Sequence, residues 1–195
     1  SFQQAAAEYK DRTWDMADQM GRLRDLWWTF NRMNTPPTSE YGCGHSYDFY
    51  VPPELFKDHP EYFPLVDYRF EKSPDHRLPY ANMIKTDTPK RMGGEGSLQR
   101  CFSNPDVLTL VVAGTRKLFD ENPNLRCAPL TINDGPWWCR CDNCKAMGPT
   151  DSHRYLAFCN QVAEANEKLY PDRGYVFLAY EETLEPPVGM KMHHN

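Results

Sequence analysis

Apolar residues recur at spacings of three and four in three stretches of the chain, a pattern typical of amphipathic helices. The second stretch follows Ser103-Asn104-Pro105-Asp106, where a capping side chain, a proline and an acid stand in the order that begins a helix. We therefore predict helices over residues 16–30, 107–119 and 152–170.

Short apolar runs between and after these helices predict strands. Residues 98–102 and 126–132 are two such runs, and Pro129 favours an edge or a bulge for the second. Residues 175–180 are apolar without interruption, as expected of a strand covered on both faces of a parallel sheet. Residues 8–11 form a shorter strand-like entry. The alternation of strand and helix predicts an α/β fold of right-handed βαβ units, either a doubly wound sheet or a barrel.

Two further stretches show neither helical nor strand periodicity. Residues 68–99 are polar and contain three prolines, so we interpret them as a surface insertion. Residues 41–46 are rich in glycine and lead into residues 52–57, a short helix with proline at its start. This order places His45 on a loop or at a strand end.

The composition is that of a globular domain, and we expect residues 1–195 to fold as one unit. Hydrophobic residues make up 40% of the chain and charged residues 25%, with a formal net charge of −5. Because no stretch concentrates lysine and arginine, we expect no nucleic-acid partner. Because no run of about 18 apolar residues occurs, we expect no membrane-spanning helix. An aromatic content of 13% suits the binding of sugar rings as well as core packing.

Candidate chemistry gathers in Asn133-Asp134-Gly135-Pro136-Trp137-Trp138, directly after a predicted strand. Functional residues of parallel α/β folds lie beyond the carboxyl ends of strands. Asp134 could transfer a proton there, and Asn133 could bind sugar hydroxyls. Trp137 and Trp138 could stack on a sugar face. The alternative, in which Asp134-Gly135 is only a turn, is equally compatible with the sequence.

Three other regions offer residues to the same site. Glu181 and Glu182 follow the last predicted strand and could supply the second carboxylate that most glycosidases use, although glutamates in such places are commonly only solvated. Tyr180 ends that strand and could contact the sugar. His45 could bind substrate, although a single histidine more often makes a structural hydrogen bond.

The densest group of cysteines is Cys139, Cys141 and Cys144, in a C-x-C-x-x-C arrangement. Three thiolates at this spacing could bind one structural zinc ion, with His153 or Cys159 as a fourth ligand. The spacing is also compatible with a disulfide between two of the three, or with thiols that only pack. No other cofactor is predicted.

Several signatures resemble the barrel domain of domain-of-unknown-function family 4838, which is similar to α-glucuronidase-type barrels and includes glycoside hydrolase family 163. The resemblance covers most of the chain, with an arginine more usual where Lys10 stands. The matching signatures are Glu8-Tyr9-Lys10-Asp11, Gly44-His45-Ser46, His59-Pro60-Glu61-Tyr62-Phe63, Cys101-Phe102-Ser103-Asn104-Pro105, Asn133-Asp134-Gly135, Cys139-Arg140-Cys141-Asp142-Asn143-Cys144-Lys145-Ala146 and Leu178-Ala179-Tyr180.

The resemblance implies a (β/α)₈ TIM-type barrel in a secreted or periplasmic bacterial enzyme that degrades polysaccharides. It further implies endo-β-N-acetylglucosaminidase activity on N-glycans. A full barrel takes about 250 residues, so we expect this chain to hold a portion of one. The resulting hypothesis is hydrolysis of glycans that contain N-acetylglucosamine, with Asp134 as a catalytic or acetamide-orienting acid. A non-catalytic carbohydrate-binding barrel and a zinc-clamped interaction domain are the two alternatives.

Overall fold

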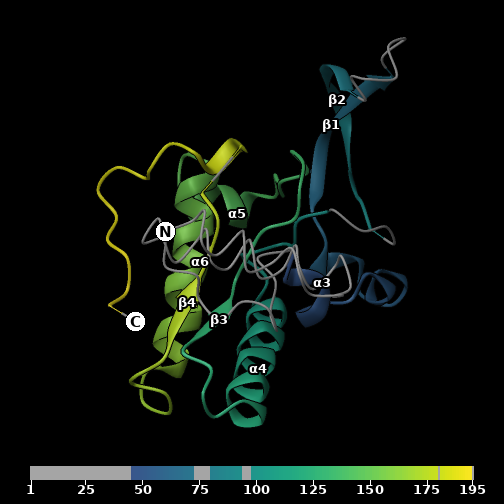
Figure 1. The fold of residues 1–195 in the computed structure, drawn as a ribbon. Coiled ribbons are helices and arrows are strands. Elements are labelled where there is room, and N and C mark those ends of the chain that lie inside the picture. The colour runs from purple at the N-terminus through teal and green to yellow at the C-terminus, as the bar shows by residue number, and fades with distance from the viewer. Residues whose placement is uncertain (1–44, 73–79, 94–97, 180, 195) are drawn as a thin grey trace, which may run out of the picture. The chain divides into compact units, whose positions relative to one another are not determined.

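The chain divides into two units, Ser1–Gly42 and Cys43–Asn195. All residues described below belong to the second unit. The helix predicted over residues 16–30 and the strand predicted over residues 8–11 lie outside the described part. The structure, a computed structural model, describes residues 45–72, 80–93, 98–179 and 181–194 (Figure 1).

Helix α4, Pro105–Glu121, confirms the helix predicted after the capping motif. The Asn104 Oδ1 atom accepts hydrogen bonds from the backbone N–H groups of Asp106 at 2.8 Å and Val107 at 3.4 Å. These bonds satisfy donors that the first turn of a helix leaves without partners. One face of α4 lies in the core, and its buried residues are Val107, Val111, Val112, Thr115 and Phe119.

Helix α6, Asp151–Asn166, confirms the helix predicted to begin near residue 152. Thr150 caps it through a hydroxyl that accepts a backbone hydrogen bond from the first turn. The last residue, Asn166, is buried, and its amide donates to the hydroxyls of Thr115 at 3.0 Å and Tyr175 at 2.9 Å. These two bonds tie the end of α6 to α4 and to the strand that follows α6.

Strands β3, Cys127–Pro129, and β4, Gly174–Val176, pair in parallel. The short helix α5, Asp142–Ala146, and α6 lie between them in the sequence, so the segment is one βαβ unit. Both strands are shorter than predicted, and the residues of β4 are half-buried rather than fully covered. Such a unit is the repeat of barrels and of doubly wound sheets alike, so the (β/α)₈ barrel stays a prediction.

A long antiparallel hairpin replaces most of the insertion that we predicted to be irregular. It consists of β1, Leu65–Lys72, and β2, Tyr80–Arg91. The alternation of Val66 and Tyr68 with charged neighbours is a strand signal that the polar composition of the stretch concealed. Pro89 is tolerated because, among the described residues, this sheet contains β1 and β2 alone.

The strand predicted over residues 98–102 is wrong. These residues are buried but pair with no strand in the described part of the chain, and they lead directly into the cap of α4. Burial, rather than strand pairing, explains their apolar character. Arg100 lies among them with no exposed surface, and its guanidinium donates to the backbone oxygens of Val51 and Leu98.

The core forms where α4 and α6 meet the segments before β1. The helix α3, Tyr47–Tyr50, contributes both of its terminal tyrosines. The predicted helix at residues 52–57 is present as a 3-10 helix, η2, Pro53–Lys57, and is followed by η3, Pro60–Tyr62. A last 3-10 turn, η4, spans Glu181–Thr183. Within the described residues, each helix is too short or too polar to cross a membrane.

Candidate functional site

The loop after β3 is fixed by the segment that precedes α3. The backbone N–H of Ser46 donates to the Thr131 carbonyl oxygen at 3.1 Å, and the N–H of Thr131 donates to the Ser46 hydroxyl at 2.8 Å. Both residues are fully buried or nearly so. Their pairing brings His45 beside the predicted loop 133–138, although 87 residues separate His45 from Ile132.

The His45 ring lies between the Ile132 carbonyl oxygen and the Asp134 carboxylate. The His45 Nδ1 atom lies 3.1 Å from the Ile132 carbonyl oxygen, which can only accept, so Nδ1 carries a hydrogen. The His45 Nε2 atom lies 3.2 Å from the Asp134 Oδ2 atom. This contact is an ion pair only when the imidazole is protonated. The side chains are 38% and 63% exposed, so the pair faces solvent.

Glu181 reaches the same loop from the far end of the chain. Its Oε2 atom accepts a hydrogen bond from the backbone N–H of Gly135 at 3.1 Å. Glu181 has a φ angle of +52°, which is uncommon for a residue other than glycine and is concentrated at functional sites. The Glu181 carboxylate therefore contacts the loop at Gly135, the residue after Asp134. Glu182 is exposed, and Tyr180 lies outside the described residues.

Asn133 lies inside the protein and holds the base of the loop. Its Nδ2 atom donates to the Asp48 Oδ1 atom at 2.8 Å and to the Leu98 carbonyl oxygen at 2.9 Å. The same Asp48 oxygen accepts from the buried guanidinium of Arg100 at 2.7 Å. Because both amide hydrogens are used internally, the predicted contact of Asn133 with sugar hydroxyls receives no support. Its Oδ1 atom is enclosed without a hydrogen-bond partner.

The two tryptophans of the loop face opposite environments. Trp138 is 2% exposed and packs edge-on against Phe102 and Tyr155, so its indole belongs to the core instead of a sugar-binding surface. Trp137 is half-buried and stacks on Tyr68 of β1, with ring centroids 5.7 Å apart and planes inclined by 5°. The sequence analysis did not consider Tyr68, because it lay in the presumed insertion.

Four cysteine thiols converge beside this loop. The Sγ atom of Cys101 lies 3.6 Å from that of Cys139, and 3.8 Å from those of Cys141 and Cys144. All four sulfur atoms lie within 4.8 Å of one another, and the group could hold a metal ion. Cys101 thus occupies the place for which we predicted His153 or Cys159.

Neither of the two predicted fourth ligands is close to the cluster. The His153 ring contacts the Thr150 hydroxyl at 2.7 Å and the Val188 carbonyl oxygen at 3.2 Å, and Cys159 is buried in the main core. All cysteines of the described residues are free thiols, and no disulfide joins Cys139, Cys141 and Cys144 in this structure.

The surroundings of the cluster favour negative charge on sulfur. Backbone N–H groups point at two sulfurs, from Leu65 to Cys139 at 3.3 Å and from Cys144 to Cys141 at 3.4 Å. Hydrogen bonds from the thiols of Cys139 and Cys144 lower the pKa of Cys101, and the same bonds raise the pKa of its two donors. Cys101 is therefore more readily deprotonated than Cys139 or Cys144.

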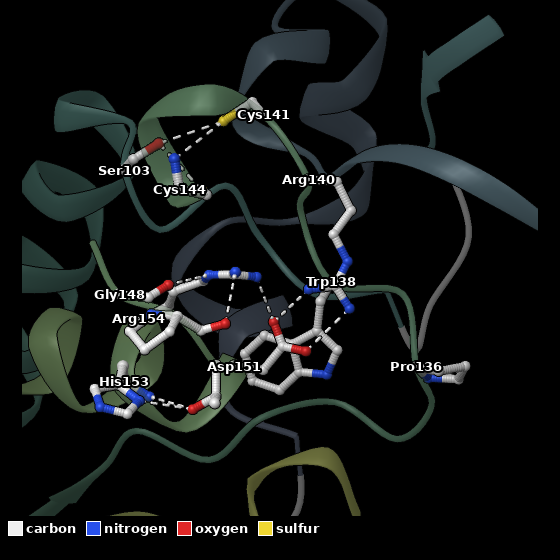
Figure 2. A network of polar contacts seen from close by, with 12 residues as sticks. Ser103, Pro136, Trp138, Arg140, Cys141, Cys144, Gly148, Asp151, His153 and Arg154 are labelled. Carbon is white, nitrogen blue, oxygen red and sulfur yellow. Dashed lines mark hydrogen bonds and ion pairs between the residues drawn. The ribbon is translucent and has the colours of Figure 1, made fainter. Parts of the chain in front are cut away.

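The cysteine segment is joined to α6 by a buried ionic network (Figure 2). The Arg140 guanidinium donates to both carboxylate oxygens of Asp151, at 2.6 and 3.0 Å. Arg154 donates to the same carboxylate at 2.8 Å and to the Gly148 carbonyl oxygen at 3.0 Å. A paired arginine fork on one carboxylate fixes direction as well as distance, so the segment between Cys139 and Cys141 is held firmly.

A second group of possible metal ligands lies at the end of α6. It contains Glu167, His193 and His194. The Glu167 carboxylate already pairs with His194 at 3.3 Å and with His193 at 3.8 Å. The His194 side chain is 69% exposed. Because these ion pairs account for the arrangement, the thiol cluster is the better candidate for a metal site.

Comparison with known proteins identifies the family of the chain. The sequence model of domain of unknown function DUF4838 matches residues 2–195, so the chain belongs to this family. No curated protein and no solved structure matches the chain.

Proposed function

We propose that this DUF4838 member hydrolyses glycosidic bonds in glycans that contain N-acetylglucosamine, with Asp134 and His45 as the groups that handle the proton. The proposal depends mainly on the contact of 3.2 Å between the His45 Nε2 atom and the Asp134 Oδ2 atom. The other ring nitrogen of His45, Nδ1, already contacts the Ile132 carbonyl oxygen. A carboxyl group and an imidazole that meet at an exposed position could pass a proton to a leaving-group oxygen.

The neighbouring groups suit the same reaction. Glu181 offers a second carboxylate at the adjacent loop position, where it could stabilise positive charge as the glycosidic bond breaks. Trp137 and Tyr68 offer aromatic surface beside the loop. In a substrate with an N-acetyl group, the acetamido oxygen can act as the nucleophile, and Asp134 would then orient that group instead of protonating the leaving oxygen. The whole site would lie at the carboxyl end of β3, as in other parallel α/β folds.

Turnover of complex N-glycans by the Asp134→Asn variant tests this proposal. General acid–base catalysis contributes about 10²- to 10⁴-fold, so we expect kcat to fall by at least a hundredfold. Asp142→Asn is the matched control, because its carboxylate is fully exposed on α5 and should leave kcat unchanged. Wild-type turnover by Asp134→Asn would contradict the assigned role. Glycan binding without any cleavage by the wild type would favour a non-catalytic carbohydrate-binding domain.

A second proposal concerns the thiol cluster, which we propose to bind one structural zinc ion through Cys101, Cys139, Cys141 and Cys144. Tetrahedral zinc with Zn–S bonds of about 2.3 Å separates its sulfurs by about 3.8 Å. The three separations from the Cys101 sulfur, of 3.6, 3.8 and 3.8 Å, agree with this value. Because four thiolates leave no open coordination position, the ion would stabilise the loop region without activating water.

Metal analysis of the purified full chain tests the zinc site and its fourth ligand together. We expect one zinc per chain in the wild type and a loss of at least tenfold in zinc affinity for Cys101→Ser. His153→Ala and Cys159→Ala should keep one zinc, because neither side chain is near the four sulfurs. A zinc-free wild type, or retention of zinc by Cys101→Ser, would overturn the assignment.

A further inference from the structure

We propose that Tyr68 is a positioning residue for the Asp134 loop, and that the thiol cluster anchors the hairpin that carries Tyr68. The proposal rests on the proposed zinc site and assigns a role to the β1–β2 hairpin. In this role the thiol cluster holds the Asp134 loop in place through the hairpin. The hairpin contacts the cluster at its base and the loop three residues further along β1.

The base of the hairpin is bonded to the cysteine segment on both strands. Leu65 begins β1 and is the register partner of Arg91, which ends β2. The Leu65 N–H donates to the Cys139 sulfur at 3.3 Å, and its carbonyl oxygen accepts from the N–H of Arg140 at 2.7 Å. Two bonds on consecutive residues fix β1 in register with the Cys139 segment.

Arg91 supplies the contact from the second strand. Its guanidinium lies 3.7 Å from the Cys139 sulfur and donates to the Phe63 carbonyl oxygen at 2.5 Å. Four thiolates on one dication would leave a net charge of −2, which a neighbouring arginine partly offsets. Hydrogen bonds to a thiolate are stronger than those to a neutral thiol, so metal loading would tighten both hairpin contacts.

Tyr68 transmits this anchoring to the loop. Its side chain is 7% exposed, and its hydroxyl donates to the Pro136 carbonyl oxygen and accepts from the Trp138 N–H at 3.1 Å. Its ring stacks on Trp137. One side chain therefore bonds the backbone at Pro136 and at Trp138, the residues on either side of Trp137. Loss of the hydroxyl would remove both bonds and leave the ring in place, with the Trp138 N–H still donating to the Pro136 carbonyl oxygen at 2.8 Å.

Amide hydrogen exchange of the full chain tests the proposal without requiring a substrate. Removal of zinc by a chelator should raise exchange at least tenfold at residues 65–69 and 136–141, with α4 and α6 unchanged, and added zinc should reverse the rise. Arg91→Met should raise exchange at the hairpin base while one zinc remains bound, and Lys90→Met is the exposed neighbouring control. Tyr68→Phe should raise exchange in residues 134–138 alone.

Turnover adds a readout that a purely structural role would not change. Tyr68→Phe should lower kcat while KM and the unfolding midpoint stay nearly constant. Unchanged exchange at the hairpin after zinc removal would overturn the anchoring. A rise in exchange throughout α4 and α6 as large as that at the hairpin would also overturn it. Absence of zinc would overturn both this proposal and the zinc site. A wild type that binds zinc but cleaves no glycan would contradict only the proposed hydrolysis, and exchange would still decide this inference.

Discussion

The thiol cluster and the Asp134 loop lie next to each other but are built in opposite ways. The cluster is closed: Cys101, Cys139 and Cys144 are each less than 5% exposed, and their sulfurs face one another. The loop is open: Asp134 is 63% exposed and meets a half-exposed His45. The geometry of a closed set of ligands restricts which ions can bind. An open site restricts the size and shape of its ligand much less.

Because of this difference, the zinc proposal depends on distances between ligands and the hydrolysis proposal depends on the chemistry of exposed side chains. For the cluster, three sulfur separations agree with those expected around a tetrahedral zinc ion. For the loop, the contact between His45 and Asp134 supports only the proposed proton transfer, and an assay must identify the substrate. The same contrast predicts how each region responds to substitution, because buried interactions contribute to stability and exposed ones contribute little.

The largest effect on stability should follow loss of a cluster ligand. Cys144→Ser removes one of four thiolates, and loss of a structural metal is among the few changes that cost more than about 4 kcal/mol in the free energy of unfolding. Urea unfolding with and without added zinc measures the loss. Cys127→Ser is the matched control, since Cys127 is half-buried in β3 and outside the cluster. Equal stability of the two variants would show that the cluster is packing alone.

A somewhat smaller loss should follow removal of the carboxylate between the two arginines. Asp151→Ala leaves Arg140 and Arg154 without their shared partner, and breaking a buried ion pair typically costs about 3–5 kcal/mol. The partly exposed position of Arg140 places the expected value near the lower end. Chemical unfolding of Asp151→Ala beside Asp142→Ala, which should change stability by less than about 0.5 kcal/mol, measures the difference.

The smallest effect on stability should come from the open site. His45→Gln removes the partner of Asp134, but exposed ion pairs contribute only about 0–1 kcal/mol. We therefore expect a nearly unchanged unfolding midpoint together with at least a tenfold fall in glycan turnover. A loss of more than about 2 kcal/mol would instead assign the pair to the fold, and the contrast between the closed and open regions would fail.

Local signals in the sequence predicted α4 and the start of α6. Asn104 caps α4 because a capping side chain, a proline and an acid act within a single turn, and no distant residue is needed. The start of α6 follows from the same kind of local rule at Thr150. The β1 strand was also locally encoded, in the alternation around Val66 and Tyr68, but the polar composition of residues 68–99 obscured it.

The parts of the candidate sites that were missed depend on distant contacts. Cys101 completes the cluster although 38 residues separate it from Cys139. The spacing of a cysteine motif relates only ligands that are close in the sequence, so it could not identify Cys101. Trp137 and Trp138 are chemically identical in the sequence, and only the packing of Phe102 and Tyr155 decides which of them is buried. His45 was identified by type, but its partner Asp134 was fixed by the pairing of Ser46 with Thr131.

The uneven spacing of the four cysteines also bears on how the chain reaches its native state. Three of them lie within six residues, so an unfolded chain could capture an ion locally at small entropic cost. Cys101 would then join last and close a loop of 38 residues around the bound ion. That closure draws the cap of α4 toward the segment leading to α6, so an early-bound ion would shorten the conformational search and speed refolding.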